Sequence, residues 1–96
     1  MLAVTPSLEV QSAPPVSVVA AHLKADPKRP LQWRLEIDSG ARGNHSRVVQ
    51  GGAADGADRE PLATVRVDSP GEAVLSVYDH GRLLARTERG FGAPPR

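Results

Sequence analysis

Hydrophobic and polar residues alternate without a break between Leu31 and Asp38. Leu31, Trp33, Leu35 and Ile37 occupy every second position, and polar or charged residues occupy the positions between them. A period of two is that of a β-strand with one buried and one solvent-exposed face, and it does not fit a helix. The pattern therefore predicts a strand over Leu31–Asp38 whose apolar side belongs to the protein core.

Similar apolar and alternating stretches, separated by turn-forming residues, predict six more strands. These are Ser7–Gln11, Val16–Lys24, His45–Gln50, Leu62–Asp68, Glu72–Tyr78 and Arg82–Arg89. The last two are expected to form a hairpin around Asp79-His80-Gly81, where glycine supplies the positive φ of the turn. Apolar residues nowhere recur at helical spacing over three turns. The chain is therefore predicted to be an all-β sandwich of about seven antiparallel strands in two sheets.

A glycine-rich segment, Ser39–Gly52, follows the strongest strand and ends in Gln50-Gly51-Gly52. It lacks the Gly-Lys-Ser/Thr ending of a phosphate-binding loop and precedes a strand instead of a helix. We expect its glycines to allow a crossover and a close approach of two backbones, and residues 51–58 to be a flexible connection. A strong strand beside a loop without catalytic chemistry favours a binding module over an enzyme.

Composition narrows the possible functions further. The 96 residues suffice for one domain, 1–96, with ends at about 1–6 and 90–96 that are expected to be frayed. Its aromatic residues are Trp33, Tyr78 and Phe91, so valine, leucine, alanine and isoleucine must form most of the core.

A net charge of +1 argues against a nucleic-acid-binding protein, and no apolar run approaches the roughly 20 residues of a membrane span. There is no cysteine, and the start lacks the features of a signal peptide. The chain is thus expected to be either cytoplasmic or a mature chain after cleavage.

The three histidines, His22, His45 and His80, lie on different predicted elements. No two of them have the spacing of zinc ligands, so we expect neither a metal site nor a cofactor. His45 is adjacent to Ser46, but neighbouring residues of a strand point to opposite faces. The pair is therefore not a nucleophile and its base, and we expect no enzymatic activity.

Exposed arginines are the most distinctive feature of the predicted outward faces. Arg34, Arg66, Arg82 and Arg86 alternate with apolar neighbours and should project from the sheets. In a seven-stranded sandwich the third, sixth and seventh strands share a sheet. The residues expected on its exposed face are Gln32, Arg34, Glu36, Ser76, Tyr78, Arg82 and Arg86. The alternative interpretation is a charged face that serves solubility alone.

Several motifs follow one another in the order typical of one known family. They are Trp33-Arg-Leu-Glu-Ile-Asp-Ser-Gly40, Ser46-Arg-Val-Val-Gln-Gly-Gly52, Pro61-Leu-Ala-Thr-Val-Arg-Val67 and Asp79-His-Gly-Arg-Leu-Leu-Ala-Arg86. With them the chain resembles the CsgC/CsgH family of curli amyloid inhibitors, from about Leu8 to Arg89. The Ser-x₃-Gln-Gly-Gly element is the most specific part of the resemblance.

The resemblance implies an immunoglobulin-like β-sandwich in the periplasm, with its signal peptide removed. It also implies a chaperone-like inhibitor that keeps the curlin subunit CsgA from polymerising into amyloid. CsgC proteins carry a Cys-x-Cys pair, and because this chain has no cysteine, a redox role does not apply.

The expected partner is an unfolded or oligomerising CsgA chain, met by a monomer without membrane insertion. The residues expected to contact it are Gln32, Arg34, Tyr78, Arg82 and Arg86. Prolines beside the strands and charges on outward positions are devices against edge-to-edge strand addition, which favours this face. Pairing at a strand edge is the competing mechanism. The competing function is an immunoglobulin-like extracellular adhesion or carbohydrate-binding module.

Overall fold

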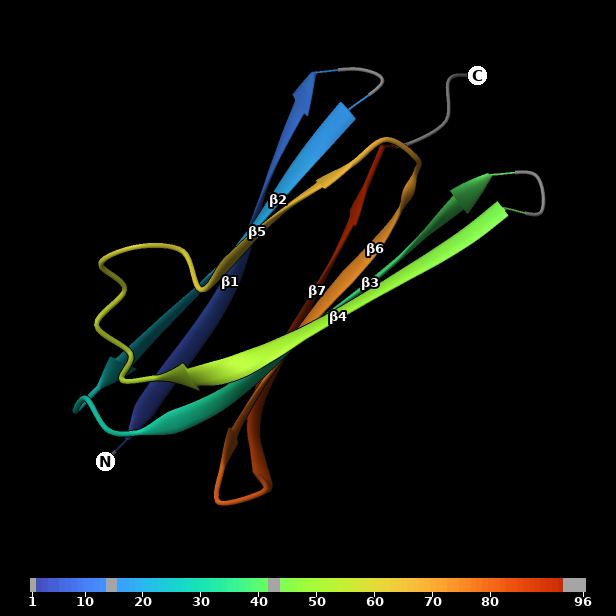
Figure 1. The fold of residues 1–96 in the computed structure, drawn as a ribbon. Helices are drawn as coiled ribbons and strands as arrows, with labels where there is room; N and C mark the ends of the chain where they lie inside the picture. The colour runs from blue at the N-terminus through green and yellow to red at the C-terminus, as the bar shows by residue number, and fades with distance from the viewer. Residues whose placement is uncertain (1, 14–15, 42–43, 93–96) are drawn as a thin grey trace.

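The computed structural model describes residues 2–13, 16–41 and 44–92. They form seven strands joined by turns (Figure 1). The strands are β1 (Ala3–Ala13), β2 (Val16–Asp26), β3 (Leu31–Ala41), β4 (Asn44–Ala54), β5 (Ala63–Val67), β6 (Gly71–Asp79) and β7 (Arg82–Phe91). In the described part of the chain, no helix has the length and hydrophobicity to cross a bilayer.

The strands pair into two antiparallel sheets, which confirms the predicted β-sandwich. One sheet has the order β1-β2-β5 and the other the order β4-β3-β6-β7. The third, sixth and seventh strands therefore share a sheet, as predicted. Side chains from both sheets meet between them, with Val19 and Ala21 from β2 packing among Leu35, Ile37 and Leu75. The resulting core consists mainly of aliphatic residues, as the composition indicated.

The glycine-rich segment is where the fold departs most from the sequence-based expectation. Ser39–Ala41 continues β3, and Asn44–Ala54 forms β4, which pairs with β3 over eleven residue pairs. The segment is therefore a hairpin within one sheet and not a crossover between sheets; its residues 42 and 43 lie outside the described part. The expected close approach is present, because a Cβ at Gly52 would lie 3.3 Å from the Trp33 ring.

Trp33 packs against the core, as expected, but it is less buried than its apolar neighbours on β3. The sequence places it in the core with Leu31, Leu35 and Ile37, and these three are fully buried. Trp33 is only partly buried, because its neighbour on β4 is Gly52, which has no side chain to cover it. It packs at the margin of the core, beside the edge of the sheet.

The first and last strands extend closer to the ends of the chain than expected. β1 begins at Ala3, because its pairing with β2 extends from Ala3 opposite Asp26 to Ala13 opposite Val16. At the other end β7 continues to Phe91, whose side chain is 7% exposed and packs in the core. Strand pairing holds the first end and burial of an aromatic ring holds the second, so the frayed residues expected at 3–6 and 90–91 belong to strands. Residues 93–96 lie outside the described part.

The connection from β4 to β5 is also built more closely than its glycines suggest. Gly51–Ala54 belongs to β4, and the backbone N–H of Ala25 donates to the carbonyl of Gly56 at 2.9 Å. Gly56 has a φ of +84°, and a Cβ there would collide with Ala25. This glycine is required for a tight contact with β2, and it does not serve as a flexible spacer.

Candidate functional site on the outer face of the four-stranded sheet

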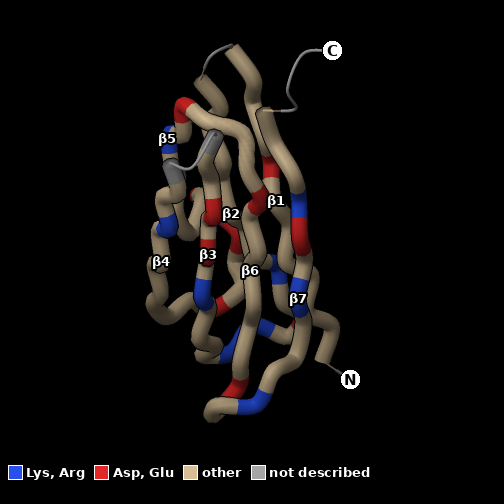
Figure 2. Tube along the Cα trace, turned by 90° about the vertical axis from the view of Figure 1, so that its right-hand side faces the viewer, with Lys and Arg blue, Asp and Glu red and all other residues tan. Residues whose placement is uncertain are grey.

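The candidate site is the solvent-facing side of the sheet β4-β3-β6-β7, which we call the outer face. Its residues alternate with buried ones along each strand and form rows across the sheet. It comprises Gln32, Arg34, Glu36, Asp38, Arg47, Val49, Val74, Ser76, Tyr78, Leu83, Arg86 and Glu88. Basic and acidic residues follow one another along β7, whereas on β3 Arg34 is followed by the acidic Glu36 and Asp38 (Figure 2).

The register brings Arg34 and Arg86 into one row, on either side of Ser76. Adjacent strands are about 4.8 Å apart, so the two backbones lie roughly 10 Å from each other. Both arginine side chains are about half exposed. The structure thus places two of the predicted arginines together on one face.

Both arginines are paired with carboxylates and are not free charges. The Arg34 Nε atom lies 3.1 Å from Oε1 of Glu36, and Nη2 of Arg86 lies 3.0 Å from Oε1 of Glu88. Arg47 of β4 donates to Oε2 of Glu36 at 2.6 Å and approaches Asp38 at 4.0 Å. The outer face therefore carries a network in which Glu36 joins arginines from β3 and β4.

Glu36 is the electrostatic centre of this network. The hydrogen bond from Arg47 lowers the pKa of Glu36, and the positive charges of Arg34, Arg47 and Arg86 act in the same direction. Partial desolvation acts against them. The same hydrogen bond raises the pKa of Arg47. Both shifts favour the charged forms, so the hydrogen bond between Arg47 and Glu36 joins two ionised side chains at neutral pH.

A shallow depression of about 270 Å³ lies beside these ion pairs. It is lined by Glu36, Val74, Ser76, Tyr78, Leu83 and Arg86. Leu83 is 52% exposed and Tyr78 is partly buried, so the depression combines an apolar side with a charged side. Such a surface can contact a polypeptide through both charges and apolar side chains.

Arg82 does not belong to the outer face, which corrects the sequence-based prediction. A register irregularity lies opposite Val77 and Tyr78, where Ala85 pairs with Val77 but Leu83 pairs with Tyr78. The extra residue of this bulge reverses the alternation, as bulges do. Leu83 therefore lies beside Tyr78, and Arg82 lies opposite Asp79 at the hairpin end. Strict alternation through Arg82, Leu84 and Arg86 missed this shift.

Gln32 and Tyr78 share the next row, as predicted, but Gln32 has a structural contact as well. Its side-chain oxygen accepts a hydrogen bond from the backbone N–H of His80 at 3.2 Å. His80 has a φ of +51° in the turn that joins β6 and β7. Gln32 therefore helps to hold this turn in place. A role of these residues in partner binding stays a prediction.

Arg47 and Leu83 were not among the predicted site residues. Arg47 was overlooked because the predicted strand His45–Gln50 was not paired with the strand before it; pairing β3 with β4 as a hairpin sets Arg47 opposite Asp38. Leu83 was overlooked because alternation within β7 alone does not reveal the bulge. Both signals require the register of two strands to be considered together.

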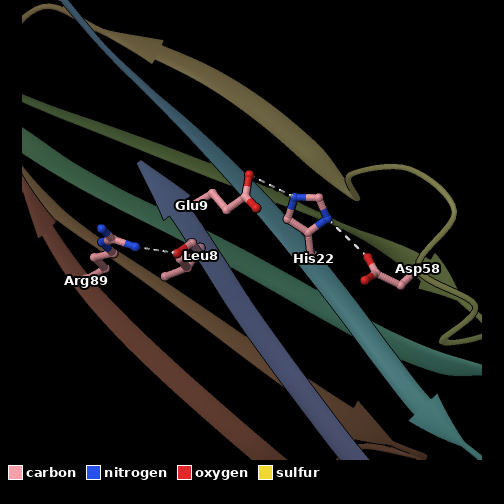
Figure 3. A network of polar contacts seen from close by, with 5 residues as sticks. All are labelled: Leu8, Glu9, His22, Asp58 and Arg89. Carbon is pink, nitrogen blue, oxygen red and sulfur yellow. Dashed lines mark hydrogen bonds and ion pairs between the residues drawn. The ribbon is translucent and has the colours of Figure 1, made fainter. Parts of the chain in front are cut away.

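The predicted Arg66 lies on the other sheet, and that sheet has a smaller polar network. His22 Nδ1 of β2 lies 3.1 Å from Oδ1 of Asp58, and its Nε2 lies 3.8 Å from Oε2 of Glu9 on β1 (Figure 3). His22 Nε2 is buried and has no hydrogen-bond partner. Among the described residues, no group of three histidines and carboxylates is arranged to hold a metal ion.

Comparisons with known proteins give one informative match. No protein-family model and no curated protein matches this sequence. The solution structure of CsgH from R. palustris matches with a TM-score of 0.71 over 92% of this chain and 92% of that chain, at 16% sequence identity. The likeness extends over nearly the whole sandwich. The chain therefore has a CsgH-like fold.

Proposed function

We propose that this chain binds the curlin subunit CsgA, as an unfolded or oligomerising polypeptide, and delays its polymerisation into amyloid. The observation that carries the proposal is the CsgH-like fold over 92% of the chain. The resemblance of Ser46–Gly52 to the CsgC/CsgH family supports the same assignment. In this proposal the domain acts as a monomer in the periplasm.

The outer face is the surface that we propose for this contact. Amyloid grows when a chain adds to an open strand edge, so an inhibitor has to engage the client before its strands pair. Arg34 and Arg86 offer two positive charges in one row, and the depression between Tyr78 and Leu83 offers apolar surface. Because both arginines already have carboxylate partners, a client has to compete for them, and the contact is weak and transient.

Paired substitutions test this surface. Replacing Arg34 and Arg86 by serine is expected to raise the amount of domain needed to double the amyloid lag by about two- to thirtyfold, because exposed charge contacts contribute about 0.2–1 kcal/mol each. Thioflavin T time courses with purified CsgA measure the lag. Arg66→Ser is the matched control, since Arg66 is an exposed arginine on β5 of the other sheet.

Two further results decide the proposal. Added salt is expected to weaken inhibition by the unmodified domain, because the Debye length is about 8 Å at physiological ionic strength. Circular dichroism has to show that each variant keeps its fold. An unmodified domain that leaves the lag unchanged overturns the proposed function, whereas equal inhibition by all variants overturns the outer face as its site.

A further inference from the structure

The sandwich has four edge strands, and three of them carry features that block strand addition. β1 contains Pro6, which cannot donate a backbone hydrogen bond. Arg89 of β7 donates from Nη1 to the carbonyl of Leu8 at 3.0 Å (Figure 3). This contact occupies a backbone acceptor of β1 and brings β7 against it. β1 is thus unsuited to pair with another chain.

The edges β5 and β7 are protected in other ways. β5 has only five residues, lies between Pro61 and Pro70, and carries Arg66 on its exposed side. β7 contains the bulge at its pairing with β6 and a series of charged residues that ends with Glu88 and Arg89. Short length, nearby prolines, bulges and charges are the known means by which edge strands avoid pairing.

β4 has none of these features over most of its length. Val48–Ala54 contains neither a charged residue nor a proline. Throughout the described residues of β3 and β4, the pairing runs in one continuous register. Every second residue of an antiparallel edge strand directs its N–H and C=O away from the sheet. β4 therefore presents a regular row of unpaired backbone donors and acceptors.

A recess of about 300 Å³ lies where this edge ends. Its lining includes Leu23, Trp33 and Gly52, together with the segment that leads from β4 to β5. Since Gly52 has no side chain, the Trp33 ring is accessible beside the edge. The recess can thus receive an apolar or aromatic side chain from a strand that lies along β4.

We propose that the β4 edge binds an extended, uncharged polypeptide segment as an added β-strand, with one apolar side chain in the recess beside Trp33. The unpaired backbone selects an extended chain, and the uncharged stretch Val48–Ala54 selects a neutral one. Segments of about six or seven residues with high β-propensity and low net charge have this chemistry, and they are the segments that form amyloid. The inference deepens the proposed function and depends on it only for the identity of the client.

A second copy of this chain is a poorer occupant of the edge. If two β4 strands paired antiparallel about Gly51, Val48 and Val49 would face Ala54 and Ala53, and Gln50 would face Gly52. Cross-strand side-chain contacts are the unit of sheet stabilisation, and these pairs offer little contact area. In this register the partner residues beside Gly52, Ala53 and Ala54 are Gln50, Val49 and Val48, so a second copy brings no aromatic side chain to the recess.

Two probes test the inference with the ¹⁵N-labelled domain. One is freshly desalted CsgA, and the other is a peptide of about seven residues that alternates valine with glutamine, carries one phenylalanine, and has terminal lysines for solubility. Binding at the edge is expected to protect every second amide of β4 from hydrogen exchange, and to leave β5 and β7 unchanged. It is also expected to shift the fluorescence of Trp33, the single tryptophan of the chain.

Proline variants identify the edge directly. Adjacent residues of β4 direct their N–H groups to opposite sides, so one of Val49→Pro and Gln50→Pro removes an edge donor and keeps the ladder with β3. The variant that keeps the unmodified unfolding midpoint is expected to weaken peptide binding about tenfold. If both prolines unfold the domain, the exchange pattern of the unmodified domain decides alone. Arg66→Ser is the control, because Arg66 lies on β5 of the other sheet and its substitution leaves both the outer face and the β4 edge intact.

The outcomes separate the two proposals. If the peptide protects β4 but CsgA neither binds nor changes its lag, the edge inference stands and the proposed function fails. If CsgA is inhibited while neither probe protects β4, the edge inference fails alone. Protection of β4 that rises with domain concentration in the absence of a probe would assign the edge to a second copy and overturn the inference.

Discussion

At the scale of single residues, Glu36 is central to the outer face because each of its two carboxylate oxygens is paired with a different arginine. Oε1 lies near Arg34 and Oε2 accepts from Arg47, so one side chain holds two arginines on neighbouring strands. A network of this kind fixes arginine side chains that would otherwise be free in solvent. It also means that removal of Glu36 releases two positive charges at once.

The lowered pKa of Glu36 leads to a pH dependence of stability. The hydrogen bond from Arg47 makes the pKa lower in the folded chain than the ordinary value of 4.5, so folding favours the ionised carboxylate. The resulting stabilisation is present above about pH 4.5 and is lost as the pH falls through the folded pKa. Glu36→Gln is therefore expected to unfold at lower urea concentration than the unmodified domain at pH 7, and the difference is expected to be smaller at pH 3.

Urea unfolding at the two pH values measures this difference, and Glu88→Gln is the comparison variant. Glu88 also pairs with an arginine, but it joins only Arg86. Its substitution should therefore have a smaller effect at pH 7. A difference between Glu36→Gln and the unmodified domain that grows toward acid pH would contradict the assigned role of Glu36.

At the scale of elements, apolar and alternating stretches between turn-forming residues predicted the seven strands, but they did not fix how neighbouring strands pair. Leu31–Asp38 alternates so regularly that its buried and exposed sides follow from sequence alone. Arg82 and Arg47 show the limit, since the first depends on a bulge in β7 and the second on β4 pairing with β3. Trp33 is a third example of this limit, because it stays partly exposed where its neighbour on β4, Gly52, has no side chain to cover it.

Gly71 gives a test of pairing at this scale. It follows Ser69-Pro70 and reads as a turn residue, yet it is the first residue of β6 and pairs with Ser39. A Cβ there would collide with the backbone carbonyl of Asp38 and lie 2.8 Å from Cα of Ser39. Because backbone cannot give way as a side chain can, Gly71→Ala is expected to destabilise the domain by about 1–3 kcal/mol.

Gly90→Ala is the matched control for this prediction, measured by urea unfolding in the same buffer. Gly90 lies one strand away on β7, where a Cβ would meet its nearest atom, the Gly71 carbonyl oxygen, at 3.8 Å. That distance is an ordinary van der Waals contact, so the substitution should change stability little. Equal effects of the two substitutions would show that the β3–β6 pairing is looser than the structure indicates.

At the scale of the whole molecule, the two sheets enclose two clusters of buried residues, and β3 contributes Leu35 and Ile37 to one and Leu31 to the other. The alternation of β3 sends Leu35 into the core and Arg34 and Glu36 to the outer face. The sandwich could be predicted from sequence because its core residues alternate, whereas the β4 edge could not, since only the arrangement of sheets shows which edges are protected.

Leu35 and Leu83 form a pair of leucines that tests this division between core and surface. Leu35 is fully buried on β3, while Leu83 is 52% exposed on β7. Leu35→Ala is expected to lower the free energy of unfolding by about 2–5 kcal/mol, through lost burial and the cavity left behind. A domain of this size has a total free energy of unfolding of roughly 5–14 kcal/mol, so the loss is a large part of its stability.

Leu83→Ala should change the unfolding midpoint little but should weaken client binding at the outer face. Thermal unfolding followed by circular dichroism measures the first effect, and the amyloid lag at a temperature where both variants are folded measures the second. A Leu83→Ala variant that loses as much stability as Leu35→Ala would place Leu83 in the core and remove it from the outer face.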